Sequence, residues 1–395
     1  MRPARLPIPP SRPGAPSVAG RRARAGLAGL LALASIACTA EEPPPSSTEA
    51  EITIAYLFDG SPPDAELVTG PPLAGLELAA RQAGDVEIEP VNVGLEPAEA
   101  LASLRALGED PGVVAAVVAP WTGPPAGAIA LLAEDRVPVV TLSWAWGPPP
   151  ATAGEGLWLS FAVGRAAEAV LLLSGAASAS PGDAAICLAG DDHPTSRTLL
   201  ATTEELGRAV GAPEVVAAGV VTDEADAVAA RIEDAGCAML VWTGGADAAT
   251  SLLREVPDPP ATVATSRIKT EDGIELAASG PEVLTVCACA DVSLSTDPTH
   301  QRFVHDLQAE SGAPPGPFGV EAYDAGRLLI GLVDAEGDVR EELAAALGGL
   351  ERFRGLETVY AFEPDGSRAP GKEAGRWRAA GSRWMPAEPP TAPLA

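Results

Sequence analysis

The sequence predicts an α/β protein made of two Rossmann-like lobes, each a parallel sheet with helices on its faces. From residue 52 onward, short apolar runs alternate with amphipathic stretches, which is the pattern of consecutive βαβ units. The run at 113–119 is apolar throughout, as expected of a parallel strand buried on both faces. A Pro/Gly-rich break at 147–156 divides this alternation into two series.

The first series places strands and helices in strict alternation. Strands are predicted at 52–58, 86–93, 113–119 and 137–143. Helices are predicted at 73–84, ended by Gly84, at 97–108, begun by Pro97, and at 126–135. The loops between them are short, so the crossovers should be right-handed.

The second series follows the break. A strand at 157–161 and a helix at about 165–174 come first. Further strands are predicted at 184–190, 214–221, 238–245, 261–266 and 282–290, with helices at 195–210 and 225–236. Helices alone follow at 298–311, 318–334 and 339–348, and then a hairpin within 356–384 that turns at Pro364-Asp365-Gly366. An eight-fold β/α barrel also alternates, but the break, the helical block and the hairpin favour two lobes.

The N-terminal region resembles a secretory signal. Residues 1–24 carry six arginines and no acid, and an apolar run from Ala25 to Ala37 precedes Cys38. At ~1.5 Å per residue, this run is shorter than the ~30 Å bilayer core. Ser35-Ile36-Ala37-Cys38 resembles a lipoprotein box, which predicts a signal peptide at 1–37 and a lipid on Cys38. Plain secretion with cleavage nearby is the alternative. Residues 38–50 read as a Pro/Ser-rich tether, and 386–395 as a disordered tail.

The charge argues against some partners. The formal net charge is −28, and removal of residues 1–37 would lower it to −34. Nucleic acid is excluded as a partner, because its binding needs Lys and Arg to neutralise phosphates. The acids could favour a cationic ligand, but they are dispersed, which is more typical of a solvated acidic surface.

The cysteines leave alternatives open. Four remain after Cys38, and outside the cytoplasm they could pair in three ways or stay as buried thiols: Cys187, Cys237, Cys287 and Cys289. Cys287 and Cys289 should point to one face of a strand. The spacing is poor for zinc, and no metal or other cofactor is predicted.

The sequence shows no catalytic motif, so we expect a binding protein and not an enzyme. It lacks a nucleophile elbow, a Walker loop and a zinc-protease motif. Asp192 and His193 stand in the loop after the strand at 184–190, and ligands of open α/β sheets bind beyond such strand ends. An ordinary polar turn that starts a helix is the alternative for this loop.

Aromatic and hydroxyl side chains gather at the same kind of position. Five of the seven tryptophans lie at or near strand ends: Trp121, Trp144, Trp146, Trp158 and Trp242. They could stack on a ligand or pack in the core. Polar candidates follow strands as well: Asp59, Thr122, Gly123, Ser143 and Thr243. Hydroxyls and free amides at a helix N-terminus can hold an anion such as a carboxylate.

The order of elements resembles the type 1 periplasmic binding proteins, most of all the branched-chain amino-acid receptors of ABC transporters. The stretches that carry the resemblance are ITIAYLFDGSPP, VVAAVVAPWTGPPAGAIALLAEDRVPVVTLS, AAICLAGDD, FGVEAYDAGRLLIGLVDA and RFRGLETVYAFEPDG. The resemblance implies two lobes joined by a three-crossover hinge, with ligand in the cleft. It places Thr122 where the family has a serine that holds the ligand carboxylate. Ser143 falls near a second contact, and His193 near an aromatic that covers the ligand.

The resemblance also implies lobe boundaries and partners. The first lobe would comprise 51–160 and 292–352, and the second 161–291 and 353–385. A small-molecule ligand, the membrane subunits of an ABC permease and a membrane reached through lipidated Cys38 are the expected partners. The sequence departs from the family at Trp121-Thr122-Gly123 and in LSFAVGR, and only Glu271 and Asp272 are candidates to hold an amino group. A permease-independent sensing or envelope scaffold lipoprotein is therefore the alternative function.

Overall fold

The computed structural model describes residues 52–62, 65–84, 86–94, 96–147, 156–180, 184–209, 214–222, 225–336, 340–369 and 375–387. The predicted signal peptide, Cys38 and the tether lie outside these residues. Within them, no helix has both the length and the apolar character needed to cross a membrane.

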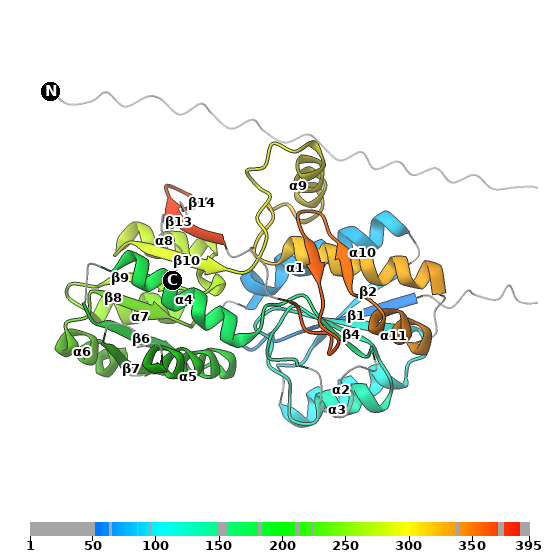
Figure 1. Cartoon of the computed structure of the whole chain (residues 1–395), viewed down its shortest axis with the longest axis horizontal. Helices are drawn as coiled ribbons and strands as arrows, with labels where there is room; N and C mark the ends of the chain where they lie inside the picture. Colours follow the sequence, from blue (N-terminus) through cyan, green and yellow to red (C-terminus); the bar gives the residue numbers. More distant parts are fainter. Residues whose placement is uncertain are drawn as a thin grey trace, which may run out of the picture. The chain divides into compact units, whose positions relative to one another are not determined.

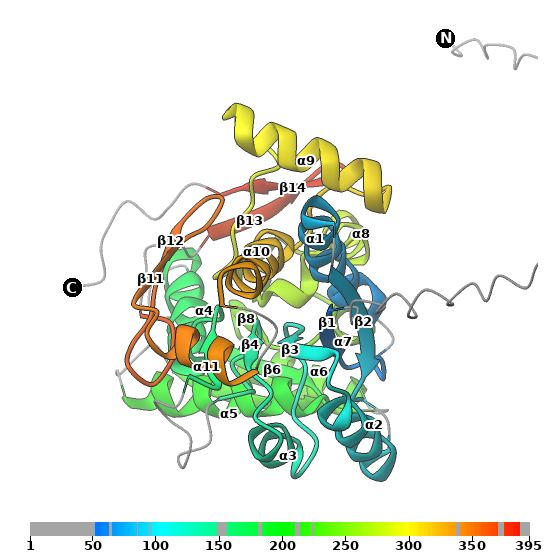
Figure 2. The same ribbon diagram turned by 90° about the vertical axis from the view of Figure 1, so that its right-hand side faces the viewer.

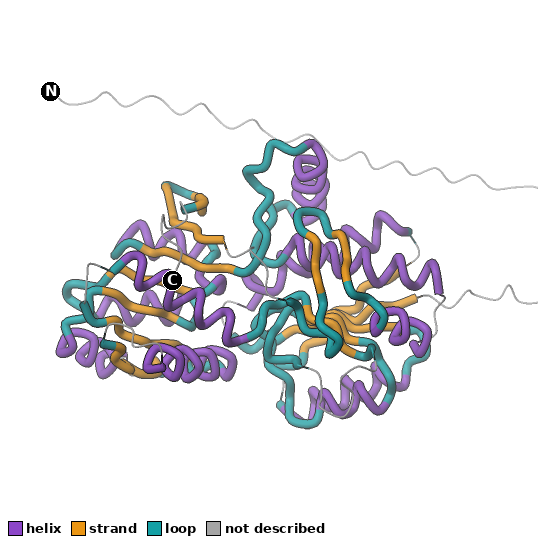
Figure 3. The backbone as a smooth tube through the Cα atoms, in the orientation of Figure 1, coloured by secondary structure: helices purple, strands orange, loops and turns teal. Residues whose placement is uncertain are grey.

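The first sheet is wholly parallel, with strand order β2-β1-β3-β4-β5. Its strands are β1 (Ile52–Phe58), β2 (Val86–Asn92), β3 (Val113–Val118), β4 (Val139–Thr141) and β5 (Trp158–Ser160). The helices of this part are α1 (Ala65–Ala83), α2 (Pro97–Glu109) and α3 (Ala128–Glu134). Figures 1 and 3 show the strands enclosed between helices.

The side chains of β1 alternate between two cores. Ile54 and Tyr56 pack with Leu76 of α1, whereas Ala55 and Leu57 pack in the cluster that contains Leu104 of α2. Both sets are buried, because helices cover both faces of the sheet.

The second sheet has the strand order β14-β13-β10-β9-β8-β6-β7. Five of its strands run parallel: β6 (Ile186–Asp191), β7 (Val215–Val221), β8 (Met239–Trp242), β9 (Ala261–Ala264) and β10 (Val283–Cys287). The antiparallel strands β13 (Gly375–Ala380) and β14 (Arg383–Pro386) extend its edge. Helices α4 (Arg165–Ala179) and α5 (Pro194–Ala209) contribute to one core, and α6 (Ala225–Ala235), α7 (Ala246–Glu255) and α8 (Glu271–Ser279) to the other.

Three later helices complete the described chain: α9 (Pro298–Ser311), α10 (Gly319–Glu336) and α11 (Arg340–Gly348). Helices α1 and α10 lie side by side, as Figure 2 shows, and pack closely. A Cβ at Gly75 would stand 2.2 Å from the carbonyl oxygen of Gly319. Glycine at position 75 therefore permits this close approach of the two backbones.

Several element boundaries differ from the sequence prediction. Helix α1 begins at Ala65 and contains Pro71 and Pro72, which the prediction had placed before the helix. Helices α7 and α8 were not predicted. Thr270 caps α8 by accepting a hydrogen bond from the Gly273 amide, a local signal that the prediction overlooked.

The prediction of a single hairpin at the C-terminal end was wrong. Strands β11 (Arg352–Arg354) and β12 (Val359–Ala361) form one two-stranded sheet, and β13 and β14 form a separate hairpin. The Pro364-Asp365-Gly366 turn lies in the sequence between Phe362 and Arg368, which form an isolated β-bridge. Pro386 also belongs to β14, so the predicted tail begins one residue too early. The lobe boundaries stay a prediction.

The cysteines pair within the second part of the chain. Cys187 of β6 is bonded to Cys237, and Cys287 at the end of β10 is bonded to Cys289. One of the three connectivities left open by the sequence is thereby selected. Each bridge joins two cysteines from neighbouring segments of the fold, so neither bridge links distant strands.

Candidate functional site

Three of the predicted residues meet at the carboxyl edge of the first sheet. Asp59 follows β1, Thr122 follows β3 and Ser143 follows β4, and these strands are neighbours. The Asp59 amide donates to Thr122 Oγ1 at 3.2 Å, and Ser143 Oγ donates to the Thr122 carbonyl at 2.9 Å. Parallel neighbours end at one edge, which explains why sequence reasoning could bring them together.

His193 joins this edge from the second sheet. Its Nε2 lies 3.1 Å from Asp59 Oδ2, and its Nδ1 lies 2.7 Å from Thr195 Oγ1. Burial raises the pKa of Asp59, but hydrogen bonds from His193 and Ser61 outweigh it and lower the pKa from 3.8 to about 2. We call Asp59, Thr122, Ser143 and His193 the strand-edge network.

A pocket, here the edge pocket, opens beside this network. Its cavity volume is about 10 Å³, and Asp59, Thr122, His193 and Arg267 line it. The buried Arg267 follows β9 and donates to Asp191 Oδ2 at 3.0 Å. Asp191 Oδ2 also accepts from the Gly245 amide at 2.8 Å.

Sequence reasoning missed Arg267 and Asp191. Arg267 stands directly after the strand predicted at 261–266, so the rule that drew attention to His193 could have found it. The sequence prediction ended the strand at residue 190 and so placed Asp191 in the loop that follows, although Asp191 ends strand β6 and is buried.

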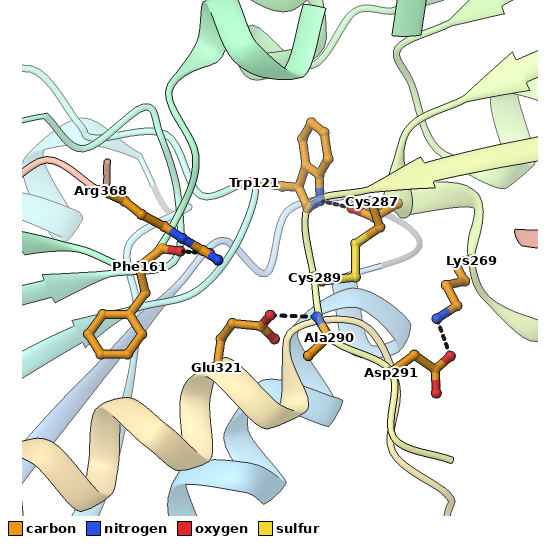
Figure 4. Close-up of a disulfide and its surroundings, with 10 residues drawn as sticks. Trp121, Phe161, Lys269, Cys287, Cys289, Ala290, Asp291, Glu321 and Arg368 are labelled. Atoms are coloured by element: carbon orange, nitrogen blue, oxygen red, sulfur yellow. Dashed lines mark hydrogen bonds and ion pairs between the residues drawn. A yellow bond between two sulfur atoms is a disulfide. The ribbon is translucent and has the colours of Figure 1, made fainter. Parts of the chain in front are cut away.

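Trp121 lines both the edge pocket and a second pocket. Its backbone φ is 64°, a left-handed conformation that is unusual for a bulky residue. Its indole Nε1 donates to Ser266 Oγ at 3.2 Å and its ring packs with Leu172 of α4. Figure 4 shows its side chain near the Cys287–Cys289 bridge. Trp121 thus follows a strand of the first sheet in the sequence, whereas its side chain contacts residues that belong to the second sheet and its helices.

The second pocket, which Trp121 also lines, is called the tryptophan pocket. Its cavity volume is about 10 Å³, and Trp121, Ser143, Trp144, Glu168 and Phe318 line it with others. Burial raises the pKa of Glu168 to about 7, against a hydrogen bond from Trp144 that lowers it. Sequence analysis had no signal for Glu168, because it lies on a helix and not at a strand end.

The remaining predicted residues contribute less directly. Gly123 faces helix α5, since a Cβ there would lie 3.8 Å from Thr195 Cγ2. Asp192 is exposed, and its neighbour Asp191 makes the buried contacts instead. Thr243 is buried with its Oγ1 3.0 Å from Ser196 Oγ. Glu271 is exposed, and neither it nor Asp272 lines the edge or tryptophan pocket.

The tryptophans divide into two groups. Trp121 and Trp144 line the tryptophan pocket, whereas Trp146, Trp158 and Trp242 lie in the cores and line neither the edge pocket nor the tryptophan pocket. Trp158 Nε1 donates to the Trp146 carbonyl at 2.6 Å, and the two rings stack. Proximity to a strand end therefore did not distinguish a pocket residue from a core residue.

Two buried carboxylates on α10, together with the buried Arg368 from the segment after β12, hold the segments that connect the sheets. Glu321 Oε1 accepts from the Ala290 amide at 2.6 Å, and Arg368 Nη1 donates to the Phe161 carbonyl at 2.7 Å (Figure 4). Asp324 accepts from the Leu356 amide at 2.8 Å. We call Glu321, Asp324 and Arg368 the α10 cluster.

Both carboxylates of the α10 cluster are hard to ionise. Burial raises the pKa of Glu321 to about 7, although the Ala290 amide and the Arg368 charge oppose the rise. Burial likewise raises the pKa of Asp324 to about 6, against hydrogen bonds from Leu356 and Tyr360. Among the described residues, no group of three or more His, Cys, Asp or Glu side chains could hold a metal ion.

Comparison with solved structures identifies the architecture. LivJ, a branched-chain amino acid transporter substrate-binding protein from Streptococcus pneumoniae in complex with isoleucine, matches with a TM-score of 0.67 and 16% identity. The match covers 85% of this chain and 99% of that one. A solute-binding protein from R. palustris in complex with benzoate matches with a TM-score of 0.67 and 15% identity, over 85% and 95%.

A periplasmic binding protein type 1 from Bordetella pertussis matches with a TM-score of 0.68 and 17% identity, over 85% of this chain and 99% of that one. No curated protein matches the sequence. The profile of the periplasmic binding protein family matches residues 51–374, which include the first sheet, the parallel strands of the second sheet and the residues of both pockets. This chain therefore belongs to the periplasmic binding protein family and has the type 1 fold predicted from its sequence.

Proposed function

We propose that this protein is an extracytoplasmic receptor, anchored through a lipid on Cys38, that closes on a small amino-acid-like or amphipathic ligand. It delivers that ligand to an ABC permease. The edge pocket is the observation that carries the proposal: Asp59 and Thr122 come from the first sheet, and His193 and Arg267 from the second. A pocket lined from both sheets changes shape whenever the sheets move apart.

The groups around the edge pocket suit an anionic end of the ligand. Arg267 and His193 supply cationic or N–H donors, and Thr122 supplies a hydroxyl. The contacts of Asp59 with His193 and of Trp121 with Ser266 join the two sheets in this structure. A ligand that enters exchanges these contacts for its own, so its binding is coupled to the relative position of the lobes.

Ligand screening tests the receptor function. Leucine, isoleucine, benzoate, short peptides and other aromatic acids should be added singly while the melting temperature is measured. A ligand at ~100 times its Kd stabilises the folded state by about 2.7 kcal/mol. A true ligand should also compact the protein in small-angle scattering. If no compound raises the melting temperature or changes the scattering profile, the receptor function is wrong.

The membrane anchor needs a separate test in the native host. Intact-mass measurement should find lipid on Cys38 as the first residue of the mature chain. Cys38→Ser should move the protein from the membrane fraction to the soluble extract. An unmodified Cys38 in the mature protein would contradict the anchor but leave the receptor function standing.

A permease-independent sensor or scaffold is the second candidate. It is favoured by the strand-edge network itself, in which Thr122, Ser143 and His193 already bond to protein groups. Such a protein would hold its lobes together without ligand. Identical scattering profiles with and without every screened compound, together with no co-purifying permease, would support this candidate.

A further inference from the structure

The tryptophan pocket contains a buried carboxylate with no cationic partner among the described residues. The side chain of Glu168 is buried, and the indole of Trp144 is its hydrogen-bond partner. Arg165, one turn earlier on α4, stacks over the Trp144 ring at 5.7 Å from its centroid and is itself exposed. A buried carboxylate without a counter-ion is costly to keep ionised, so an incoming cation would stabilise it.

The walls of this pocket favour the same chemistry. Trp121 and Trp144 present indole rings, and an indole face attracts a cation held within about 6 Å. The contact of Arg165 with Trp144 shows that this ring already takes a cation on one face. Trp121 and Phe318 both have left-handed φ values, of 64° and 62°, and both line the pocket. Bulky residues held in that conformation concentrate at ligand sites.

We propose that the tryptophan pocket binds the cationic group of the ligand, a primary or methylated amine, between the rings of Trp121 and Trp144 and the carboxylate of Glu168. This inference rests on the proposed receptor function and names the chemistry of its ligand. Trp121 lines both pockets, so a ligand that carries both charges would direct its anion toward Arg267 and its cation toward Glu168 as the lobes open around it. Glu168 then takes the role for which the sequence offered Glu271 and Asp272.

The test uses four probes that separate the charges. Leucine carries both charges, isoamylamine is leucine without its carboxylate, 4-methylpentanoate lacks the amino group, and tetramethylammonium is a bare cation. Calorimetry at pH 8 measures each probe on the wild type, on Glu168→Gln and on Glu271→Gln. The last variant is the matched control, because Glu271 is exposed in the first turn of α8 and its change alters the net charge equally.

Both cations should bind the wild type and Glu271→Gln, and should lose about tenfold or more in affinity on Glu168→Gln. The affinity of 4-methylpentanoate should not fall on Glu168→Gln. Cation binding should also release protons near pH 7 in the wild type and not in Glu168→Gln, because the cation favours the ionised carboxylate. Calorimetry in two buffers of different ionisation enthalpy measures that release.

Equal affinity of the cations for the wild type and Glu168→Gln would overturn the proposal, as would failure of both cations to bind the wild type. If 4-methylpentanoate or any screened acid still binds and compacts the protein, the receptor function stands and only the cation site is lost. Should Glu168→Gln fail to fold, Trp144→Leu replaces it, and unchanged tetramethylammonium affinity in that variant would equally contradict the site.

Discussion

Asp59 in the strand-edge network and Glu321 in the α10 cluster are carboxylates whose pKa values move in opposite directions. Burial raises the pKa of both, but Asp59 has His193 and Ser61 as donors and ends at about 2. Glu321 has one amide on Oε1 and no hydrogen-bond partner on Oε2, and ends at about 7. Glu321 is also the more deeply buried of the two, so the difference teaches that depth of burial and number of donors together decide whether these carboxylates ionise.

The two regions also differ in what they connect. The strand-edge network joins side chains of the two sheets across partly buried contacts. The α10 cluster holds backbone groups of Ala290, Phe161 and Leu356, which belong to the segments between the sheets. We expect the first set of contacts to break when the lobes open and the second set to persist as the pivot.

Removal of Asp324 should have the largest effect on stability. Asp324 is fully buried and accepts from the Leu356 amide and from the Tyr360 hydroxyl at 3.1 Å. Asp324→Ala leaves two buried donors without an acceptor, which should cost about 3 kcal/mol or more of unfolding free energy. Urea titration measures this loss. Asp192→Ala, at an exposed aspartate, is the control and should change stability by less than about 0.5 kcal/mol. Equal losses would refute the structural role of the α10 cluster.

Glu321→Gln should change how stability depends on pH. The folded state raises the pKa of Glu321 from 4.5 to about 7, so the folded wild type binds that proton more tightly than the unfolded chain. The contribution of the Glu321 carboxyl to the free energy of unfolding is complete below about pH 4 and is lost as the pH rises toward 7. Gln stays neutral at every pH. Between pH 4 and 8 the unfolding free energy of the variant should therefore rise relative to that of the wild type by up to about 3 kcal/mol. Parallel pH profiles for the two proteins would show that Glu321 is not desolvated.

Thr122→Val should act on both stability and binding. It removes the acceptor of the Asp59 amide, which should cost about 1–2 kcal/mol in unfolding free energy. It should also weaken the binding of an anionic ligand roughly tenfold or more. Thr122→Ser keeps the hydroxyl and serves as the control for both. Binding by Thr122→Val as tight as by the wild type, in the folded protein, would remove Thr122 from the site.

Asp59→Asn should act on stability mainly through its pH dependence. It removes an ion pair whose side chains are mostly buried, and the lowered pKa of Asp59 limits the loss to about 2 kcal/mol near neutral pH. The folded state lowers the pKa of Asp59 from 3.8 to about 2, so its contribution is present above about pH 4 and is lost as the pH falls through 2. The difference between wild type and variant should therefore vanish in acid. Small-angle scattering of Asp59→Asn should show a more open protein, and an unchanged profile would deny this contact a role in closure.

The sequence by itself determined the strands of the two parallel sheets, most helices and the family. Continuous apolar runs such as that of β3 are local signals, because a strand buried on both faces needs them in every position. The meeting of Asp59, Thr122 and Ser143 was also predictable, since adjacent parallel strands end at one edge. Helices α7 and α8 could have been found as well. The buried face of α7 repeats at helical spacing through Ala246, Ala249 and Leu253.

Only the tertiary structure decided which polar groups are buried and which partners they meet. Glu168, Glu321 and Asp324 lie on helices whose sequence pattern cannot distinguish a solvated carboxylate from a desolvated one. Their pKa values depend on segments far away in the chain, such as the Ala290 amide 31 residues from Glu321. The same holds for Arg267 and for the tryptophans, because desolvation and hydrogen bonding depend on distance in space, which the local periodicity of a chain does not encode.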